Sequence, residues 1–281
     1  MGLGVSVCKA LNKIFPLPVH PFNLQNQGVK TYAEWQYEKG GDTIKFYTAR
    51  TDADEMFKDK KVLDIGCGAG GKTLFYASGG AEKVWGIDVV EHYEAEANAL
   101  ALAKGLEDKF SFVLGDAAAL PFEEDFFDTI IMNDAMEHVD KPAEVLEECR
   151  RVLKKGGRLY VNFPPYHHPF GAHLSDVIGF PWVHLFFSDQ TLIQVYKDLV
   201  KDLPDGEMRV KFRIAKDENG REYFSYINRM TIKRFAKILK ASAFKTDYYY
   251  EAPLRGAFAP AAKIPGIKEG FVKMVVAILT K

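Results

Sequence analysis

From Lys61 onward the chain alternates short apolar runs with helical stretches, and this alternation constrains its fold more than any other feature of its 281 residues. The runs end in turn or acidic residues, as the strands of a parallel sheet do when crossover helices connect them. We predict strands at 61–65, 83–87, 110–114, 128–133 and 158–163, and helices near 71–79, 91–104 and 142–153. Lys155-Gly156-Gly157 provides the glycine stop expected at the end of the last of these helices.

Two regions depart from this rhythm. The N-terminal region carries no strand pattern, and we predict helices there at 31–39 and 42–47, separated by Gly40 and Gly41. The region after the fifth strand is rich first in Pro, His and aromatic residues and then in charges, so we interpret it as an insertion. A helix at 230–242, a strand near 244–250 and an apolar run at 271–280 complete the sheet. The resulting division is an N-terminal helical cap (1–60), a sheet domain (61–163 and 230–281) and an inserted substrate cap (164–229).

Charge and cysteine content narrow the possible partners. The chain has 37 Lys and Arg against 38 Asp and Glu, so it offers no basic surplus to a polyanion; we expect a small-molecule substrate and no nucleic acid. Cys8, Cys67 and Cys149 have neither metal-site nor disulfide spacing, so no metal is predicted. No apolar run reaches the roughly 18 to 20 residues that span a bilayer, so we expect a cytoplasmic protein without stable membrane insertion. The oligomeric state is not indicated.

The glycine-rich loop at 62–73, Val-Leu-Asp-Ile-Gly-Cys-Gly-Ala-Gly-Gly-Lys-Thr, fits more than one motif. As G-x-x-x-x-G-K-T it is a formal P-loop, in which Lys72 would contact phosphates and Thr73 would bind magnesium. As G-x-G-x-x-G it is a formal dinucleotide motif, with Asp88 near the distance expected for a ribose ligand. The pattern alone therefore does not choose between ligands, and we expect Gly71-Lys72-Thr73 to be an exposed first helical turn.

Asp64 separates these alternatives, because it places a carboxylate in the strand two residues before the first glycine. Beside a phosphate chain it would meet like charge, at a cost of roughly a few kcal/mol. S-adenosylmethionine instead brings an ammonium and a sulfonium, which a nearby carboxylate favours. Gly66, Gly68 and Gly70 would let the backbone approach the methionine part closely, since they carry no Cβ. The loop therefore favours S-adenosylmethionine over a nucleotide.

Polar residues at the ends of the later predicted strands agree with this choice. Asp88 ends the second strand, where a carboxylate accepts hydrogen bonds from ribose hydroxyls. Asp116 follows the third strand and is a candidate acceptor for the adenine amine. Asn133 and Asp134 end the fourth strand, at the switch point where ligands of such sheets bind.

With these residues in order, the sequence resembles the class I S-adenosylmethionine-dependent methyltransferases, in particular the small-molecule enzymes with an LDIGCGxG loop. The similarity covers about residues 60–163 and, more loosely, 230–281, and it is carried by the segments 63–68, 86–88, 115–122, 127–139 and 151–157. The resemblance implies a doubly wound, mostly parallel seven-stranded sheet in the order 3-2-1-4-5-7-6, with strand 7 antiparallel. It also implies S-adenosyl-L-methionine as the cofactor. The residues expected to bind it are Asp64, Gly66, Cys67, Gly68, Gly70, Asp88, Val89, Asp116, Ala117, Asn133, Asp134 and His138.

The methyl acceptor is expected at the start of the inserted cap, where four of the seven histidines are concentrated. Histidine removes protons from hydroxyls and amines near neutral pH, so His167, His168 and His173 are the candidate bases. The residues predicted to bind the acceptor are Tyr37, Tyr166, Trp182 and His184. Each of these side chains also has a structural explanation in hydrogen bonding or packing. Methyl transfer by alignment alone needs no base.

Asn162-Phe163-Pro164-Pro165-Tyr166 is similar to the N-P-P-Y motif of nucleic-acid amino-methyltransferases. Phe163 interrupts that motif, which also follows the fourth strand rather than the fifth, so we interpret the segment as a stiff loop.

The sequence thus predicts an enzyme that methylates an oxygen, nitrogen or carbon of a small metabolite. The alternatives are a non-catalytic cofactor-binding module that uses the inserted cap to hold a partner, and a P-loop nucleotide-binding protein.

Overall fold

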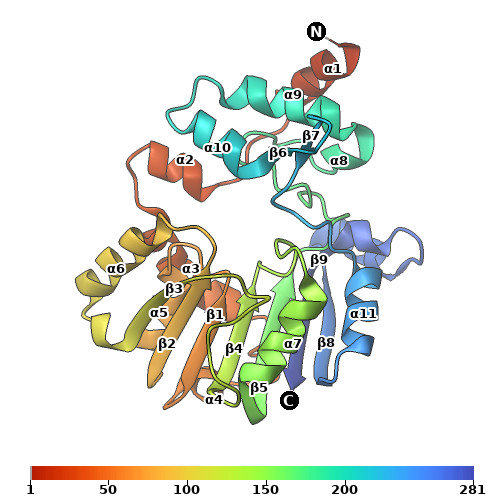
Figure 1. Cartoon of the computed structure of the whole chain (residues 1–281). Helices are drawn as coiled ribbons and strands as arrows, with labels where there is room; N and C mark the ends of the chain where they lie inside the picture. Colours follow the sequence, from red (N-terminus) through yellow and green to blue (C-terminus); the bar gives the residue numbers. More distant parts are fainter. Residues whose placement is uncertain (1) are drawn as a thin grey trace. The chain divides into compact units, whose positions relative to one another are not determined.

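The alternating segments fold into a seven-stranded sheet in the order β3-β2-β1-β4-β5-β9-β8 (Figure 1). The strands are β1 (Lys61–Ile65), β2 (Lys83–Asp88), β3 (Phe110–Leu114), β4 (Phe127–Asn133), β5 (Leu153–Phe163), β8 (Lys245–Pro253) and β9 (Val272–Thr280). Strands β1 to β5 pair in parallel, and β9 runs antiparallel to β5. Since β9 is the last strand along the chain and lies between β5 and β8, the expected order 3-2-1-4-5-7-6 is confirmed.

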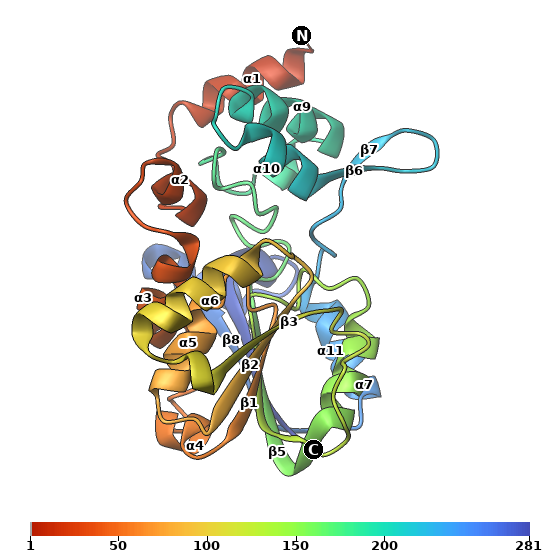
Figure 2. The same cartoon turned by 60° about the vertical axis from the view of Figure 1, so that its left-hand side comes forward.

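Helices cover both faces of this sheet, as Figure 2 shows. One face carries α3 (Tyr32–Ile44), α5 (Gly71–Ser78) and α6 (Tyr93–Lys104), and the other carries α7 (Pro142–Val152) and α11 (Ile232–Ala241). Consecutive residues of the central strands are therefore buried, as at Val62 and Leu63 in β1 and at Ile130 and Ile131 in β4. Burial on both faces is the reason these strands are continuously apolar rather than alternating.

The structure describes residues 2–281, which form two compact units. The sheet unit comprises Lys30–Phe163, Ile232–Ala252 and Met274–Lys281, and it also contains α4 (Ala53–Phe57) and the 3₁₀ turn η1 (Glu107–Lys109). The cap unit comprises the described residues up to Val29, Pro164–Thr231 and Pro253–Lys273. Met1, the first residue of the expected N-terminal cap, lies outside the described residues. The rest of that predicted cap is divided between the two units after Val29.

The cap unit has its own set of short elements. They are α1 (Leu3–Asn12), α2 (Pro21–Asn26), α8 (Val183–Phe186), α9 (Asp189–Val200), α10 (Gly206–Arg213), the hairpin β6 (Ile214–Lys216) and β7 (Glu222–Phe224), η2 (Gly256–Lys263) and η3 (Lys268–Phe271). None of the helices among residues 2–281 is sufficiently long and apolar to traverse a bilayer.

A buried ionic cluster supports the core of the cap unit. Asp176 is fully buried and accepts hydrogen bonds from Arg209 Nη1 at 3.1 Å and from the Tyr196 hydroxyl at 2.8 Å. Arg213 also pairs with Asp176, at 3.5 Å. Because both arginines are almost completely buried, removal of Asp176 would take away the carboxylate that pairs with Arg213 and would leave Arg209 with Asp205 alone. The cluster thus fixes α10 and α9 around one carboxylate.

Two local predictions are wrong, and both concern glycines. Gly40 and Gly41 do not separate two helices, because α3 continues through them to Ile44. A Cβ on Gly40 would lie 2.3 Å from the Phe75 ring, so this glycine provides close helix packing instead.

The second wrong prediction concerns the end of α7, which the Lys155-Gly156-Gly157 stop does not cap. The helix ends at Val152 and β5 begins at Leu153. Leu153 pairs with Phe127 whereas Arg158 pairs with Thr129, so the residues between them form an irregularity in β5. Gly156 has φ +76°, which glycine adopts without strain.

The two adjacent glycines of α3 provide a matched test of this packing. We predict that Gly40→Ala lowers the free energy of unfolding by about 1–3 kcal/mol, because its Cβ has no space beside Phe75. Gly41→Ala should raise it by about 0.5–1 kcal/mol, because the exposed backbone gains helix propensity. A Cβ at Gly41 would lie 3.6 Å from Phe75, an ordinary contact. Urea denaturation of both variants measures the difference, and equal effects would contradict the packing argument.

Candidate active site

The loop that joins β1 to α5 has a backbone that only glycine adopts easily. Gly66, Gly68 and Gly70 have φ values of +70°, +55° and +75°. The space around two of them is equally restrictive: a Cβ on Gly66 would lie 2.6 Å from Ala135, and one on Gly70 would lie 2.8 Å from Ala97. The loop therefore turns tightly at the carboxyl ends of the central strands, with Gly66 exposed and Gly68 and Gly70 buried.

Helix α3 packs directly on this loop through Gln36, a buried residue that no sequence motif indicates. Its side chain donates to the Cys67 carbonyl and accepts from the Gly71 N–H, each at 3.3 Å. A Cβ on Gly71 would lie 2.0 Å from the Ala33 carbonyl oxygen, so the two backbones are in close contact. A P-loop needs such N–H groups open to phosphate, whereas here Gln36 occupies that of Gly71.

The remaining P-loop residues are engaged as well. Lys72 Nζ forms an ion pair with Asp134 at 3.1 Å, and Thr73 is fully buried. The Thr73 hydroxyl donates to Asp64 Oδ2 at 2.6 Å. The prediction of an exposed first helical turn at 71–73 is therefore wrong, because these side chains turn inward to the acidic strand ends.

Asp64 is the most constrained carboxyl of the site. It is 3% exposed, and burial raises its pKa from 3.8 to about 7, against the opposing effects of the Thr73 hydrogen bond and Lys72. The nearby charge of Asp88 acts in the same direction as burial. A cation bound next to Asp64 would reduce the free-energy cost of ionising this buried carboxyl, because opposite charge favours the ionised carboxylate.

Asp88 ends β2 and closes the glycine loop. Its Oδ2 accepts from the Gly68 N–H at 2.8 Å and its Oδ1 accepts from the Val90 N–H at 3.0 Å. Burial nevertheless raises its pKa. Each carboxylate oxygen keeps a second lone pair, so ligand hydroxyls still have acceptors here. Val89, next to this acid, is 71% exposed and offers an apolar surface.

An aromatic cluster from two helices lies beside this acid. The Tyr32 ring of α3 stacks with Trp35 at 6.3 Å and approaches Tyr93 of α6 at 5.6 Å. Burial and the neighbouring charge of Asp88 raise the pKa of Tyr32, so its hydroxyl stays neutral. No sequence motif indicates Tyr32, because its proximity to the glycine loop depends on how α3 packs.

Asn133, at the end of β4, lies in a buried polar network rather than at an open edge. Its Oδ1 accepts from the Tyr47 hydroxyl at 2.6 Å and from Asn162 Nδ2 at 2.7 Å, and its Nδ2 donates to Tyr76 at 3.0 Å. The network joins β4 to β5, to α5 and to the segment after α3. The Asn162 of the N-P-P-Y-like segment is thus a structural residue of β5.

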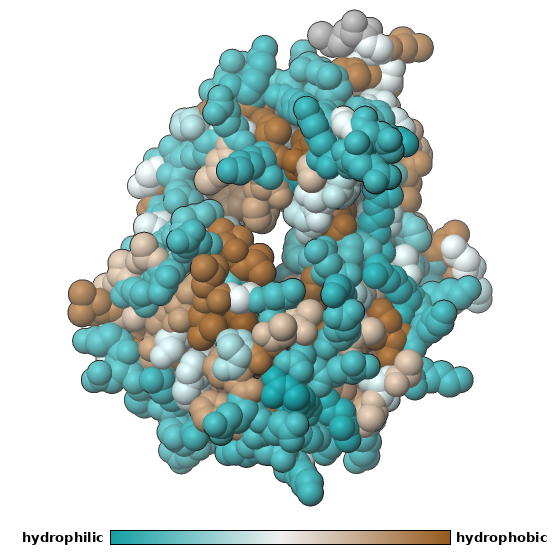
Figure 3. All heavy atoms as spheres, viewed as in Figure 1, coloured by the Kyte–Doolittle hydropathy of each residue, from teal (hydrophilic) through white to brown (hydrophobic). Residues whose placement is uncertain are grey.

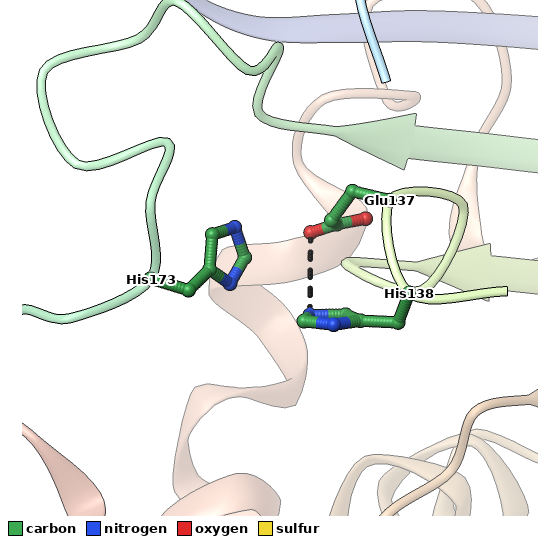
Figure 4. A group of neighbouring side chains, drawn as sticks. All are labelled: Glu137, His138 and His173. Carbon is green, nitrogen blue, oxygen red and sulfur yellow. Dashed lines mark ion pairs between the residues drawn. The ribbon is translucent and has the colours of Figure 1, made fainter. Parts of the chain in front are cut away.

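The turn after β4 adds further acids. Asp134 has φ +51° and donates its N–H to the Asn162 carbonyl at 3.0 Å. Glu137 is 3% exposed, and burial together with Asp134 raises its pKa well above the usual range. Figure 4 shows His138 beside it, with Nε2 3.8 Å from Glu137 Oε1. Sequence reasoning selected His138 and overlooked Glu137, whose burial is not visible in the motif.

The other expected cofactor residues lie at the ends of β1 and β3. Asp116 is exposed and accepts from the Ala118 N–H at 2.9 Å, which stabilises the turn, and Ala117 is buried. The Cys67 side chain packs under Gly86, where an added Cβ would lie 2.8 Å from its Sγ. The Cys67 side chain is therefore used in packing, and its backbone N–H and carbonyl have partners in Ile87 and Gln36.

The acceptor candidates lie in the cap unit, with the exception of Tyr37. Tyr166 lies 4.8 Å from His184 and 5.6 Å from His167 between ring centroids. His167 Nδ1 lies 3.1 Å from Glu269 Oε1. The structure thus brings Tyr166, His167 and His184 together. Burial lowers the pKa of His184 to about 4.

The remaining candidates have separate surroundings. His168 Nδ1 accepts from the Phe170 N–H at 3.2 Å, and burial lowers its pKa to about 4. His173 has φ +53° and lies near Tyr226, and the Trp182 indole donates to the Gly270 carbonyl at 3.0 Å.

Tyr37 is in the sheet unit, where packing accounts for its ring. It makes an edge contact with Phe75 of α5 at 6.1 Å, and Lys104 of α6 lies over its face at 4.6 Å.

Comparison with known proteins agrees with this architecture. Residues 63–161 match the family model described as a methyltransferase domain. The chain is 38% identical over 111 residues to tocopherol O-methyltransferase of Arabidopsis thaliana, covering 40% of this chain and 32% of that protein. It is 25% identical over 243 residues to a probable tocopherol O-methyltransferase of Oryza sativa subsp. japonica, covering 84% of this chain and 64% of that protein. The chain thus spans less than two thirds of either relative.

A solved structure shares the fold. The S-adenosylmethionine-dependent methyltransferase of Methanosarcina mazei superposes with a TM-score of 0.50 at 24% identity, covering 81% of this chain and 95% of that one. Sheet order, glycine loop and acidic strand ends define a doubly wound fold whose strand order reverses between β1 and β4. Residues 63–161 therefore form a methyltransferase domain, and the cofactor of this domain is S-adenosylmethionine.

The raised pKa of Asp64 predicts a pH-dependent stability. Its folded pKa of about 7 exceeds the unfolded 3.8, so stability falls as pH rises between those values. Asp64→Asn keeps an acceptor for Thr73 and removes the charge. We predict that the free energy of unfolding of Asp64→Asn, relative to that of the natural chain, is higher by about 2–3 kcal/mol at about pH 8 than at about pH 5.

Asp247→Asn is the control for this measurement. Hydrogen bonds from Thr280 and Lys245 lower the pKa of Asp247, so its contribution is constant across that range. Denaturation at both pH values measures the difference, and a gain for Asp64→Asn that does not change with pH would contradict the argument.

Proposed function

We propose that this chain transfers a methyl group from S-adenosylmethionine to an oxygen, nitrogen or carbon of a small metabolite. The observation that carries the proposal is the pair of carboxyls at the ends of β1 and β2, where Asp64 and Asp88 flank a glycine loop whose Gly68 and Gly71 N–H groups already have side-chain acceptors. The relatives named above are O-methyltransferases of a small molecule, tocopherol, which supports a small acceptor.

The residues present fit this cofactor. Gly66 leaves exposed backbone after β1, Asp88 has lone pairs for ribose hydroxyls, and exposed Val89 suits an adenine face. Asp64 carries an unfavourable buried charge that a cationic ligand would stabilise. When bound, S-adenosylmethionine supplies an electrophilic methyl group. The main contribution of the protein is then to bind and align the acceptor.

For an acceptor that must lose a proton, we propose His167 as the base. A hydrogen bond from its Nδ1 to Glu269 would leave Nε2 as the proton acceptor and fix the ring. His168 and His184 stay neutral near pH 7, but pKa values of about 4 make them weak bases. In this proposal Tyr166 and His184 help to hold the acceptor, and His173 stays a second candidate base.

The alternatives have less support. A P-loop function would require the Gly71 N–H, Lys72 and Thr73 to be open to phosphate and magnesium, whereas all three have protein partners. A non-catalytic cofactor-binding module would retain the acidic strand ends and use the cap unit to hold a partner.

We also propose a cytoplasmic location, supported by three free cysteines, and no nucleic-acid partner, supported by the formal charge of −1.

Calorimetry tests the cofactor assignment. We predict binding of S-adenosylmethionine and S-adenosylhomocysteine, and none of ATP or NAD. Because the cation lowers the pKa of Asp64 from about 7, binding of S-adenosylmethionine near neutral pH should release protons. Asp64→Asn should abolish this release and weaken the affinity. Titrations in buffers of different ionisation enthalpy measure the proton count. Tight binding of ATP alone would refute the assignment.

Substitution of the histidines tests the base. His167→Ala should lower kcat by about 10²–10⁴-fold, the range that general bases contribute, and Glu269→Gln should lower it less. His168→Ala serves as the control and should retain most of the activity, because burial makes this ring a weak base. All three variants should keep the cofactor Kd of the natural chain. A His168 effect as large as that of His167 would contradict the ranking.

A non-catalytic module predicts a different outcome. Such a protein would bind S-adenosylmethionine, show no turnover with any acceptor in a broad metabolite screen and retain a partner protein in a pull-down. Turnover of any acceptor would exclude this alternative.

A further inference from the structure

The segment between β8 and β9, drawn in blue-violet in Figure 1, is a closed loop with a fixed base. The Leu254 N–H donates to the Phe271 carbonyl at 2.8 Å, which joins its two ends. The Phe258 ring stacks on Phe271 at 6.0 Å, and the Trp182 indole, bonded to the Gly270 carbonyl, contacts both rings. We call the part of this loop that lies between Leu254 and η3, Arg255–Ile267, the tip segment.

The tip segment exposes large apolar side chains. Phe258 is 52% exposed, and Ile264 and Ile267 are each 50% exposed. The other residues are Ala, Gly and Pro apart from two cations, so the segment has no Ser, Thr, Asn or Gln side chain. A protein interface combines an apolar centre with hydrogen-bonding groups at its rim, and this segment provides none from neutral side chains.

The charge of the tip segment is entirely positive. Arg255 and Lys263 are exposed, and among residues 2–281 neither has an ion-pair partner. Glu269, the one acid between Leu254 and Phe271, is only 17% exposed and pairs with His167. Apolar side chains beside unpaired cations are the combination that binds the interface of an anionic bilayer.

A second exposed apolar pair lies close to the same base. Helix α8 begins directly after Trp182, whose indole contacts Phe258, and it exposes Leu185 and Phe186 at 51% and 69%. In the space-filling view of Figure 3 most of the visible surface is hydrophilic and the hydrophobic residues form a few groups. The two exposed sets are connected through Trp182, which precedes α8 in the chain and contacts Phe258.

We propose that the tip segment binds reversibly to the surface of a membrane that contains anionic lipid. Phe258, Ile264 and Ile267 would enter the headgroup region, and Arg255 and Lys263 would contact lipid phosphates. This contact requires no spanning helix. It does not depend on methyl transfer, because it involves neither the glycine loop nor the acidic strand ends.

Vesicle flotation of the full chain, without cofactor, tests the proposal. The natural chain should float with vesicles of phosphatidylcholine and phosphatidylglycerol, float much less with phosphatidylcholine alone, and be released as salt screens the charges. Arg255→Gln should weaken binding about fivefold, which corresponds to one basic residue near an anionic surface. Ile264→Asp should weaken it about tenfold or more, because it removes an inserted apolar group.

Leu102→Asp is the matched control, because Leu102 is 69% exposed on α6 of the sheet unit and should not affect flotation. Thermal unfolding and S-adenosylmethionine affinity of each variant show that the fold and the cofactor site are retained. Equal flotation with neutral and anionic vesicles, or unchanged flotation of Ile264→Asp, would overturn the proposal. The proposal would also be overturned if the chain did not bind vesicles and the Ile264→Asp substitution converted a dimer to a monomer. That result would identify a protein interface.

Discussion

The structure of the candidate site depends on one buried carboxyl, that of Asp64, between β1 and the first turn of α5. Its position is unfavourable for a charged group, so its pKa rises to about 7 and the Thr73 hydroxyl donates to it. A phosphate chain would add to this cost and a cationic nucleoside would reduce it. The identity of the ligand therefore follows from the sign of one charge more than from the glycine pattern.

Lys72 shows how the acidic environment determines the role of a familiar motif residue. In a P-loop this lysine would contact phosphate, but here it forms an ion pair with Asp134. Its charge also acts on the buried Glu137, whose pKa it lowers against the effect of burial. The first turn of α5 therefore lies beside acidic strand ends, where the lysine compensates carboxylates. Gln36 of α3 accepts a hydrogen bond from the Gly71 N–H, so this N–H is not free to bind a phosphate.

The cap unit presents a different physical problem, because it buries charges within a small core. Arg209 and Arg213 converge on Asp176, and histidines lose their charge when they are buried, as His168 does with its pKa of about 4. The His167 side chain, 43% exposed and paired with Glu269, keeps a polar environment suited to proton transfer. Burial thus distinguishes histidines that the sequence presents as equivalent.

The sequence by itself determined the parallel strands and the acids at their ends, because apolar periodicity is a local property of the chain, whereas the sheet order followed from the resemblance to a known family. Tertiary structure alone decided that α3 runs through Gly40, that Asn133 is held by Tyr47 and Tyr76, and that Gln36 rests on the loop. These contacts join segments far apart in sequence. Their energies depend on burial and distance, which become defined only when the chain has packed.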